Sequence, residues 1–386
     1  MTVLTLPEIE TASPQNAGLR PLDELKPRFI FEQLSQGVLG QDKAVRFVSV
    51  ALYKHTTGKV PGNLLMIGNS GTGKTTIMNN IQRLYHDVPE YRPFRAVTII
   101  NANLLVDVER MEFQPERLFN AVEQRARAIC GDQPSAEALT EAIEQATICI
   151  DEIDKMAAVV AGKPNPIGVV LQQGLLTLME GERLVHPAWV WENGEEKKVR
   201  LDIDTGNMMF ICGGAFEGLY DQVYNRVLKP GSGEKLRTHT IRTADGRVKL
   251  ETRFALSDFL KPKDLFDFGM VPQFMARFDN TVLLEDLGVE VLREILLRSY
   301  ESPLLRSRRF FEVLGVDLEI EDLAAALIAE AAKSDSRTGA RALRPIFGEI
   351  INAFEFDIEH ENRVERRPGV RPRLVVTADM ARAVIA

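Results

Sequence analysis

The sequence predicts an α/β fold in which a parallel sheet carries a phosphate-binding loop and a small, mostly helical region follows. The segment GNSGTGKT at 68–75 lies between an apolar run and a helix-compatible stretch. From residue 287 the apolar spacing becomes predominantly helical. Between these segments, apolar runs alternate with helix-like stretches, as in a parallel sheet with βα connections. The runs lie at 96–100, 146–150, 208–212 and 281–284.

The segment 68–75 has the GxxxxGK[ST] spacing of a P-loop. Its glycines let successive backbone N–H groups converge on phosphate oxygens at the positive end of the next helix. Lys74 can reach the β- and γ-phosphates, and the Thr75 hydroxyl can take one Mg²⁺ position. A glycine-rich turn without a ligand is the alternative, which the flanking strand and helix disfavour. The expected nucleotide contacts are Gly68, Asn69, Ser70, Gly71, Thr72, Gly73, Lys74, Thr75 and Thr76.

A second motif, ICIDEIDK at 148–155, supplies the acidic groups that a P-loop lacks. Asp151 ends a predicted buried strand, where its carboxylate can hold Mg²⁺ and its waters. Glu152 can then orient and activate a water for attack on the γ-phosphate. The alternative is a solvated strand end, but the position downstream of a P-loop favours the catalytic interpretation. The pair predicts ATP hydrolysis with Mg²⁺.

Composition sets the class of protein. The chain has 386 residues, of which 45% are hydrophobic, so two or three globular domains are expected. A net charge of −8 and a pI near 5.4 make nucleic acid an unlikely default partner. Its three cysteines form no CxxC pair and are expected as core residues in a reducing compartment. Without an 18-residue apolar stretch or a signal-like N-terminus, we expect a cytoplasmic protein with no membrane contact.

The domain organisation is predicted from changes in pattern. Residues 1–25 have no periodicity and are expected to form a tail or arm, and residues 26–285 a large ATPase domain. Residues 286–386 are expected to form a small helical domain. Its predicted helices are VEVLREILLRSY, DLAAALIAEAAK and IFGEIINAFEF, and the strand-like RLVV closes it.

With these motifs the chain resembles the ClpX and HslU branch of the AAA+ protein unfoldases, and ClpX most closely. The resemblance covers about residues 26–360. It implies a P-loop AAA+ large domain with a helical lid, assembled as a homo-oligomeric ring of six that remodels a protein client with ATP. Beyond the P-loop and IDEIDK, it rests on VLQQGLLTLMEG, FICGGAFEGL, FGMVPQFMARF and TGARALR.

The resemblance assigns roles to further residues. Val38 and Leu39, in LSQGVLGQDKA, are assigned to the adenine pocket. Arg277, in VPQFMARF, is assigned as the arginine finger that reaches a neighbouring subunit, and Arg341, in TGARALR, as the sensor of the small domain. A planar cation stabilises charge on the transferring phosphoryl group. An isolated arginine is more often a surface charge, but the surrounding motifs favour these roles. No γ-phosphate-sensing polar residue is obvious in MMFICGGAF.

Two departures from the family bear on partners. The family's N-terminal four-cysteine zinc module is not expected, because the first 25 residues contain no cysteine. The tripeptide that docks the ClpP peptidase is also absent from KPGSGEKLRTHTIRTADGRVKLETRF. This stretch instead predicts a basic hairpin around Ala244-Asp245-Gly246, with apolar positions at Ile241, Val248 and Leu250. Partnership with ClpP is therefore not expected.

A third departure concerns the pore. The family's aromatic GYVG loop corresponds, without a gap, to Glu109, Arg110, Met111 and Glu112. Arg110 and Met111 are the candidate pore loop, because their long stems can still grip a chain. Phe113 is two residues away. The alternatives are a ring that engages a terminus or folded partner without threading it, and a loop with no pore role.

A further hairpin is predicted at 189–201, where Asn193-Gly194 suits a two-residue turn. Trp189 and Trp191 share one face of its first strand. If exposed, they would suit client recognition, since the family has a basic loop near here. Paired tryptophans on one strand face are more often core, so burial is the expected state.

Two other functions remain open. A nucleic-acid module would use cations of the basic hairpin and of the segment SPLLRSRRFF. A nucleotide-gated scaffold would use assembly, rather than turnover, as its output. The cations in question are Arg237, Arg242, Arg247, Lys249, Arg253, Arg306, Arg308 and Arg309.

Overall fold

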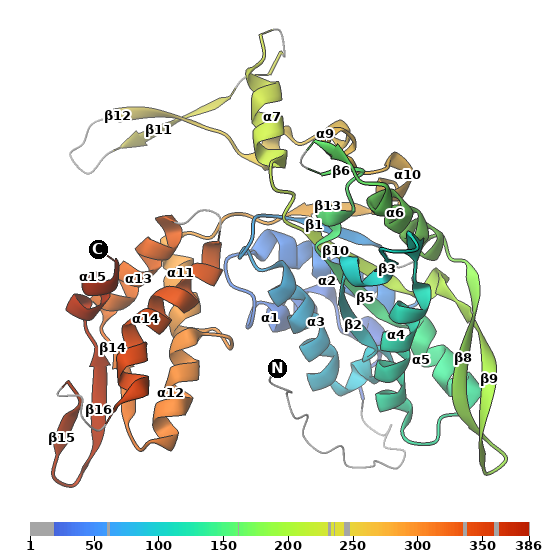
Figure 1. The fold of residues 1–386 in the computed structure, drawn as a ribbon, viewed down its shortest axis with the longest axis horizontal. Coiled ribbons are helices and arrows are strands. Elements are labelled where there is room, and N and C mark those ends of the chain that lie inside the picture. Colours follow the sequence, from blue (N-terminus) through green and yellow to red (C-terminus); the bar gives the residue numbers. More distant parts are fainter. Residues whose placement is uncertain are drawn as a thin grey trace.

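The fold comes from a computed structural model of the chain. It describes residues 19–59, 62–160, 162–230, 233–234, 236–242, 248–334, 338–358 and 363–385, and for Arg367 and the strands at 237–242 and 248–253 only the backbone. A region built on a parallel sheet occupies the centre and right of Figure 1, and a smaller region, drawn in orange and red, lies beside it.

The central sheet has five parallel strands in the order β13-β1-β10-β5-β2. The five apolar runs of the sequence form these strands, which confirms the predicted α/β class. Neighbouring strands end together, and Asn101 of β2 pairs in register with Asp151 of β5. The carboxyl ends of β1 and β5 therefore bring the P-loop and the acidic motif to one edge. The strands are β1 (Leu64–Ile67), β2 (Val97–Asn101), β5 (Thr147–Asp151), β10 (Met209–Gly214) and β13 (Asn280–Leu283).

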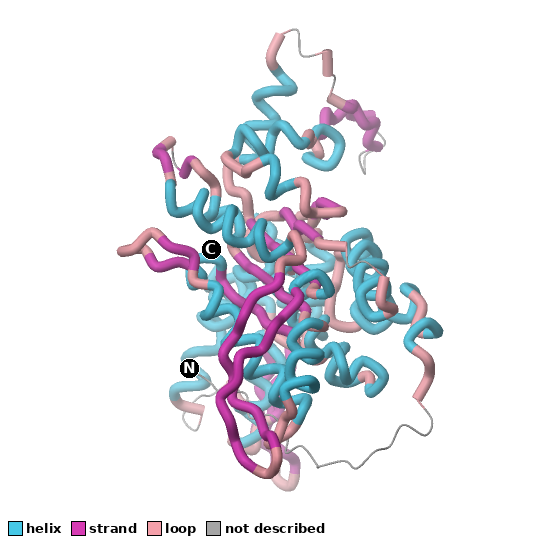
Figure 2. The backbone as a smooth tube through the Cα atoms, turned by 90° about the vertical axis from the view of Figure 1, so that its right-hand side faces the viewer, coloured by secondary structure: helices cyan, strands magenta, loops and turns pink. Residues whose placement is uncertain are grey.

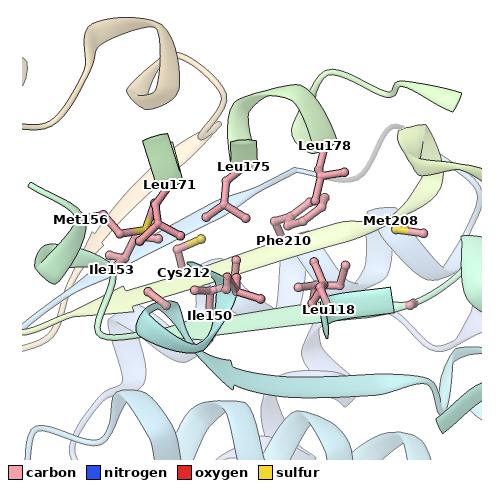
Figure 3. Packing of buried hydrophobic residues seen from close by; sticks show 14 of the residues in the cluster. Leu118, Ile150, Ile153, Met156, Leu171, Leu175, Leu178, Met208, Phe210 and Cys212 are labelled. Carbon is pink, nitrogen blue, oxygen red and sulfur yellow. The ribbon is translucent and has the colours of Figure 1, made fainter. Parts of the chain in front are cut away.

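Helices cover both faces of the sheet, because alternate strand residues point to opposite sides. Leu64 and Met66 face one core, and Leu65 and Ile67 face the other. Figure 3 shows leucines of α6 packed over strand residues of the second core. The first face carries α1 (Pro27–Leu34), α2 (Asp42–Thr56), α3 (Lys74–Asp87) and the 3₁₀ segment η2 (Pro89–Phe94). The second carries α4 (Pro115–Cys130), α5 (Ala136–Glu144), α6 (Pro166–Met179), α7 (Leu219–Leu228), α8 (Leu256–Phe259), α9 (Pro262–Phe268) and α10 (Pro272–Met275).

Within the described residues, four hairpins extend from the sheet region. The β8–β9 hairpin is the longest and runs across the face that Figure 2 presents to the viewer. The β11–β12 hairpin extends beside α7 in Figure 1, and its predicted turn at 244–246 lies outside the described residues. The strands are β3 (Val106–Asp107) and β4 (Glu112–Phe113), β6 (Val159–Val160) and β7 (Lys163–Pro164), β8 (Arg183–Glu192) and β9 (Glu195–Asp204), and β11 (Arg237–Arg242) and β12 (Val248–Arg253).

The C-terminal region has its own apolar cluster, built from residues between Leu287 and Ala381. Three of its helices match the predicted segments, and RLVV lies in β16. Sequence reasoning missed the three-stranded sheet of β14, β16 and β15 and the last helix. The boundary between residues 285 and 286 stays a prediction. The elements are α11 (Val289–Arg298), α12 (Pro303–Val313), β14 (Asp317–Ile320), α13 (Asp322–Ser334), α14 (Leu343–Phe356), β15 (Glu365–Arg367), β16 (Val370–Val376) and α15 (Ala378–Ile385).

Two expectations need correction. Part of the predicted tail at 1–25 is packed, because Leu25 is buried in the core and the 3₁₀ segment η1 (Leu22–Glu24) precedes it. Residues before 26 are therefore packed on the sheet region in part, and residues 1–18 lie outside the described part. The expected burial of both tryptophans is wrong for Trp189, which is 50% exposed. Its strand covers the core with the opposite face only, through Ala188 and Val190. Cys149 and Cys212 are buried as expected, and Cys130 is partly exposed.

Candidate functional site

A cleft of about 650 Å³ lies between the carboxyl edge of the sheet and the C-terminal region. It collects most of the residues predicted from distant motifs. The predicted residues that line it are Val38, Leu39, Ser70, Gly71, Thr72, Gly73, Lys74, Thr75, Thr76, Asp151, Glu152 and Arg341. Gly68, Asn69, Arg277, Arg110 and Met111 do not line it. The C-terminal region adds an apolar wall, which includes Leu287, Ile295 and Leu343.

The P-loop begins directly after β1 and ends in α3. Gly71 and Gly73 have φ of 75° and 107°, the left-handed backbone that glycine adopts without strain. The Nζ atom of Lys74 donates to the carbonyls of Gly68 and Asn69, at 2.5 and 3.0 Å. Burial lowers the pKa of Lys74, and the carboxylates of Asp151 and Asp154 oppose that change. The ammonium is thus held at the loop, where an incoming phosphate can replace the carbonyls as its partner.

Thr75 and Asp151 meet across the edge of the sheet. The Thr75 hydroxyl donates to Oδ2 of Asp151 at 2.7 Å. A hydroxyl oxygen and a carboxylate oxygen therefore lie side by side at this edge of the sheet. Hard oxygen ligands of this kind suit Mg²⁺, which takes one or two protein groups beside phosphates and waters. The two residues therefore fit the metal role assigned to them.

Glu152 lies at the mouth of the cleft in a strained conformation. Its φ and ψ of 59° and 37° place a non-glycine residue in the left-handed region. Oε2 of Glu152 accepts a 2.6 Å hydrogen bond from Nδ2 of Asn101, at the end of β2. Its backbone N–H donates to Oδ1 of Asp151 at 2.9 Å. The carboxylate is thus oriented by a neighbouring strand.

Asp154 joins the acidic motif to the end of β10. Its Oδ1 accepts from the N–H of Ala215 at 3.2 Å, and burial raises the pKa of its carboxyl group. Strand β10 ends in two glycines before Ala215, so no polar side chain lies at the position where the γ-phosphate sensor was sought. Glu217 is the first polar side chain after β10 that lines the cleft.

The C-terminal region closes on the P-loop through the segment 338–341. Nη1 of Arg341 donates to the Ser70 hydroxyl at 2.7 Å, and the N–H of Ala340 donates to the Gly71 carbonyl at 3.3 Å. A Cβ on Gly71 would lie 2.1 Å from the carbonyl oxygen of Thr338. The two backbones can approach this closely only because Gly71 has no side chain.

Arg277 lies away from the cleft of its own chain. Its guanidinium pairs with Glu180, at the end of α6, and its side chain is 43% exposed. The backbone carbonyl of Arg277 accepts from Nδ2 of Asn63 at 3.1 Å, which ties this loop to the start of β1. Arg277 therefore does not take part in the cleft that its own chain forms.

Comparison with known proteins identifies the family. A model described as an AAA domain (Cdc48 subfamily) matches residues 59–281. The chain belongs to the AAA+ ATPases and is ClpX-like. It is 30% identical over 381 residues to the ATP-dependent Clp protease ATP-binding subunit ClpX of Bacteroides thetaiotaomicron. That alignment covers 94% of this chain and 84% of the relative. Identity to the ClpX of Bacteroides fragilis is 30% over 92% of this chain and 83% of that one. Identity to the ClpX of Porphyromonas gingivalis is 27%, over 88% of this chain and 79% of that one.

The candidate pore loop of this ClpX-like ATPase is the turn between β3 and β4. Oδ1 of Asp107 accepts from the N–H groups of Glu109 and Arg110 at 3.0 and 3.1 Å, which fixes the turn. Met111 has φ of 54° and is 42% exposed. Phe113 instead packs on α6, where a Cβ on Gly174 would lie 2.3 Å from its ring. Phe113 is therefore a support of the loop and not a free aromatic at its tip.

Sequence reasoning missed three polar residues around the ATPase site: Gln41, Asn101 and Asp154. Each contacts a backbone group or side chain far away in the sequence. Gln41 and Asp154 lie within quoted motifs, but no role was assigned to either. An asparagine at the end of an apolar run, as in AVTIIN, was the one local signal available for Asn101. Among the described residues of this ATPase, no helix is long and apolar enough to cross a membrane.

Proposed function

We propose that this ATPase is the subunit of a six-membered homo-oligomeric ring that uses ATP and Mg²⁺ to remodel a protein client. One observation carries the proposal. The P-loop, the acidic strand end and Arg341 meet in one cleft, whereas Arg277, the remaining cation of the predicted set, points away from it. A site whose finger comes from a neighbour makes assembly a condition of hydrolysis.

Each residue has a distinct part in the proposed hydrolysis. Lys74 and the P-loop N–H groups hold the β- and γ-phosphates, while Val38 and Leu39 pack on the base. Thr75 and Asp151 hold Mg²⁺, which neutralises charge on the phosphates when bound. Glu152 removes a proton from the attacking water. Arg341 contacts the γ-phosphate from its own chain, and Arg277 does so from the neighbour, where such fingers are worth about 10³ to 10⁵ in rate.

The remodelling output rests on the family and on the shape of the cleft. Two regions of one chain form its walls, so a change at the γ-phosphate can move one region relative to the other. The relatives are ATP-binding subunits of the Clp protease. Because this chain lacks the ClpP-docking tripeptide in its 235–254 segment, we propose that it acts without ClpP.

The direct test is client capture by a hydrolysis-deficient variant. Glu152→Gln should bind ATP, stop hydrolysis and retain the client, whereas Lys74→Ala should bind neither. Both variants are compared in a pull-down from lysate of the source cell, with ATP and mass spectrometry. A protein retained only by Glu152→Gln supports the remodeller. Capture of nucleic acid alone, or of this chain alone, favours a nucleic-acid module or a nucleotide-gated scaffold instead.

The ring is tested separately by mixing variants. Arg277→Ala subunits have an intact cleft but no finger, and Glu152→Gln subunits have a finger but no base. Mixed rings contain some interfaces with both, so activity should return in part. A finger supplied in trans would be contradicted if the two variants stay inactive on mixing. It would also be contradicted if light scattering shows that the fully active species is a monomer.

A further inference from the structure

The Gln41 side chain hydrogen-bonds to three backbone groups of two residues at the junction of the two regions. It is 3% exposed and directly precedes α2. Its Nε2 donates to the carbonyls of Thr72, at 2.9 Å, and of Glu285, at 2.7 Å. Its Oε1 accepts from the N–H of Glu285 at 3.1 Å. Both donors of the amide are thus used, one on the P-loop and one on a residue 244 positions later in the chain.

Glu285 lies in the segment that leaves the sheet for the C-terminal region. Just before it, the N–H of Leu284 donates to the Ile67 carbonyl at 2.8 Å, which extends the pairing of β13 with β1. Just after it, Oδ1 of Asp286 accepts from Nδ2 of Asn69 at 2.9 Å. Residues 284–286 therefore run along the P-loop, and Gln41 holds the middle of this segment by both backbone groups.

The residues before Gln41 contact the same junction from the other side. Val38 and Leu39 line the cleft. Gly40 has φ of 71°, and a Cβ there would lie 2.7 Å from Val291 of α11. Four consecutive residues thus touch the cleft, the C-terminal region, the P-loop and the connecting segment.

We propose that Gln41 is a positioning residue that fixes the connecting segment to the P-loop, so that the C-terminal region pivots beyond residue 286. A buried amide that loses its partners is costly, so residue 285 moves together with the P-loop. Gly288 directly precedes α11, has no side chain to obstruct rotation, and a Cβ built there would meet no atom within 4 Å beyond its chain neighbours. The inference rests on the proposed function, in which nucleotide moves the C-terminal region.

The test separates nucleotide binding from movement. Gln41→Glu preserves the acceptor for the Glu285 N–H but removes both donors and sets a carboxylate against two carbonyls. Gln41→Ala removes all three bonds. Measurements on the full chain are the Kd for a fluorescent ATP analogue, kcat and KM for ATP, and the distance between fluorophores on cysteines introduced at Val185 and Val313. Both positions are exposed, and labelled subunits are diluted into unlabelled ones.

We expect Kd within about threefold of wild type for both variants, with kcat lowered about tenfold or more, because the cleft stays intact while its closure is lost. The distance change on adding ATP, measured with the Glu152→Gln substitution present, should fall by more than half. Val48→Ala is the control for lost stability, since Val48 is fully buried in α2, belongs to the apolar core and does not line the cleft. It should lower the melting temperature but preserve kcat and the distance change.

Three outcomes would overturn the inference. Wild-type kcat and distance change in both Gln41 variants would leave Gln41 a packing residue only. The same losses in Val48→Ala would assign the effect to stability. If the parent protein shows no distance change on adding ATP, the proposed movement is wrong and the inference about Gln41 falls with it. This outcome is seen in the parent protein, so it is distinct from the first two, which are seen in the variants.

Discussion

The Asn101 amide donates a 2.6 Å hydrogen bond to Oε2 of Glu152. Asn101 ends β2 and pairs in register with Asp151, the last residue of the neighbouring strand β5. Glu152 directly follows Asp151, so the two side chains lie at the same edge of the sheet. The other end of the amide is also used, since its Oδ1 accepts from the N–H of Asn103 at 3.0 Å and caps the next turn. Asn101 thus supports both the proposed base and the backbone that leads toward the pore loop.

Replacing Asn101 should therefore lower turnover. Asn101→Asp preserves the cap acceptor but removes the donor and places a like charge beside Glu152. We expect kcat to fall about tenfold or more, a part of the 10² to 10⁴ that a positioned base supplies, with KM for ATP within about threefold. Steady-state ATPase kinetics measure both. Unchanged kcat would show that Glu152 does not depend on this contact.

Gly339 is a second position where a small change should have a large effect. Its φ is 52°, and a Cβ would lie 2.9 Å from the Ser70 carbonyl oxygen and 3.2 Å from the Gly71 carbonyl carbon. Gly339→Ala should push the 338–341 segment off the P-loop and remove Arg341 from Ser70. We expect a loss of kcat of about tenfold or more, together with a higher KM, because the γ-phosphate contact and the closed cleft are both affected.

Gly348→Ala is the matched control for Gly339→Ala. Gly348 lies inside α14, and a Cβ there would point into open space, with no atom outside its own helix within 4 Å. The helix should gain roughly 0.5–1 kcal/mol from the substitution, since alanine has the higher helix propensity. Chemical denaturation checks the gain, and ATPase activity should stay at the wild-type level. Equal losses of activity in both glycine variants would remove the special role of Gly339.

The features predicted from sequence are those whose signal is local. A strand followed by GxxxxGKT, or by Asp-Glu, places its functional atoms through adjacent residues, so the P-loop and Asp151 met in the cleft as expected. Gln41 contacts Glu285, 244 residues away, and Arg277 contacts Glu180, 97 residues away. The residues that flank Gln41 and Arg277 in the sequence do not predict these partners. The strand β14 was missed because DLEI is short and half charged, and its pairing with β16 depends on residues 373–376.

The exposure of Trp189 shows why a strand pattern alone does not settle burial. The β8–β9 hairpin is a two-stranded sheet with one face on the core, and on the opposite face Val185 and Trp189 are 61% and 50% exposed. Trp189 is set opposite Lys198 on that face. Sequence reasoning identified the hairpin and its Asn193-Gly194 turn, where both residues have positive φ, but chose the wrong face for Trp189.

Fluorescence can test this exposure, because the chain has only two tryptophans. Trp191→Phe leaves Trp189 as the sole emitter, and Trp189→Phe leaves Trp191. We expect acrylamide to quench Trp189 more strongly than the partly buried Trp191. Trp189→Ala should change the free energy of unfolding by less than about 0.5 kcal/mol, whereas Val190→Ala, on the buried face, should cost about 2 kcal/mol. If Trp189 is shielded once ATP is added, then a second subunit of the proposed ring or a client covers it.

His55 predicts a pH dependence of stability. Burial lowers its pKa to about 4, from 6.5, although the Gln145 carbonyl 3.2 Å from Nε2 opposes the change. Between these two values the unfolded chain binds a proton that the folded chain excludes, so stability falls as pH is lowered through this window. The contribution of neutral His55 to the free energy of unfolding is fully present above pH 6.5. By pH 4 the free energy of unfolding has fallen by about 3 kcal/mol through this group.

A variant isolates this contribution from those of the carboxyl groups. His55→Phe can keep the apolar contact with Phe94, whose ring centroid lies 5.2 Å away, but has no group that titrates. Urea unfolding between pH 4 and 7.5 should give a smaller pH slope for the variant than for the wild type, with the two curves converging or crossing toward acid. Parallel curves would show that the pKa of His55 does not change on folding, so that its burial does not govern the acid sensitivity of this ATPase.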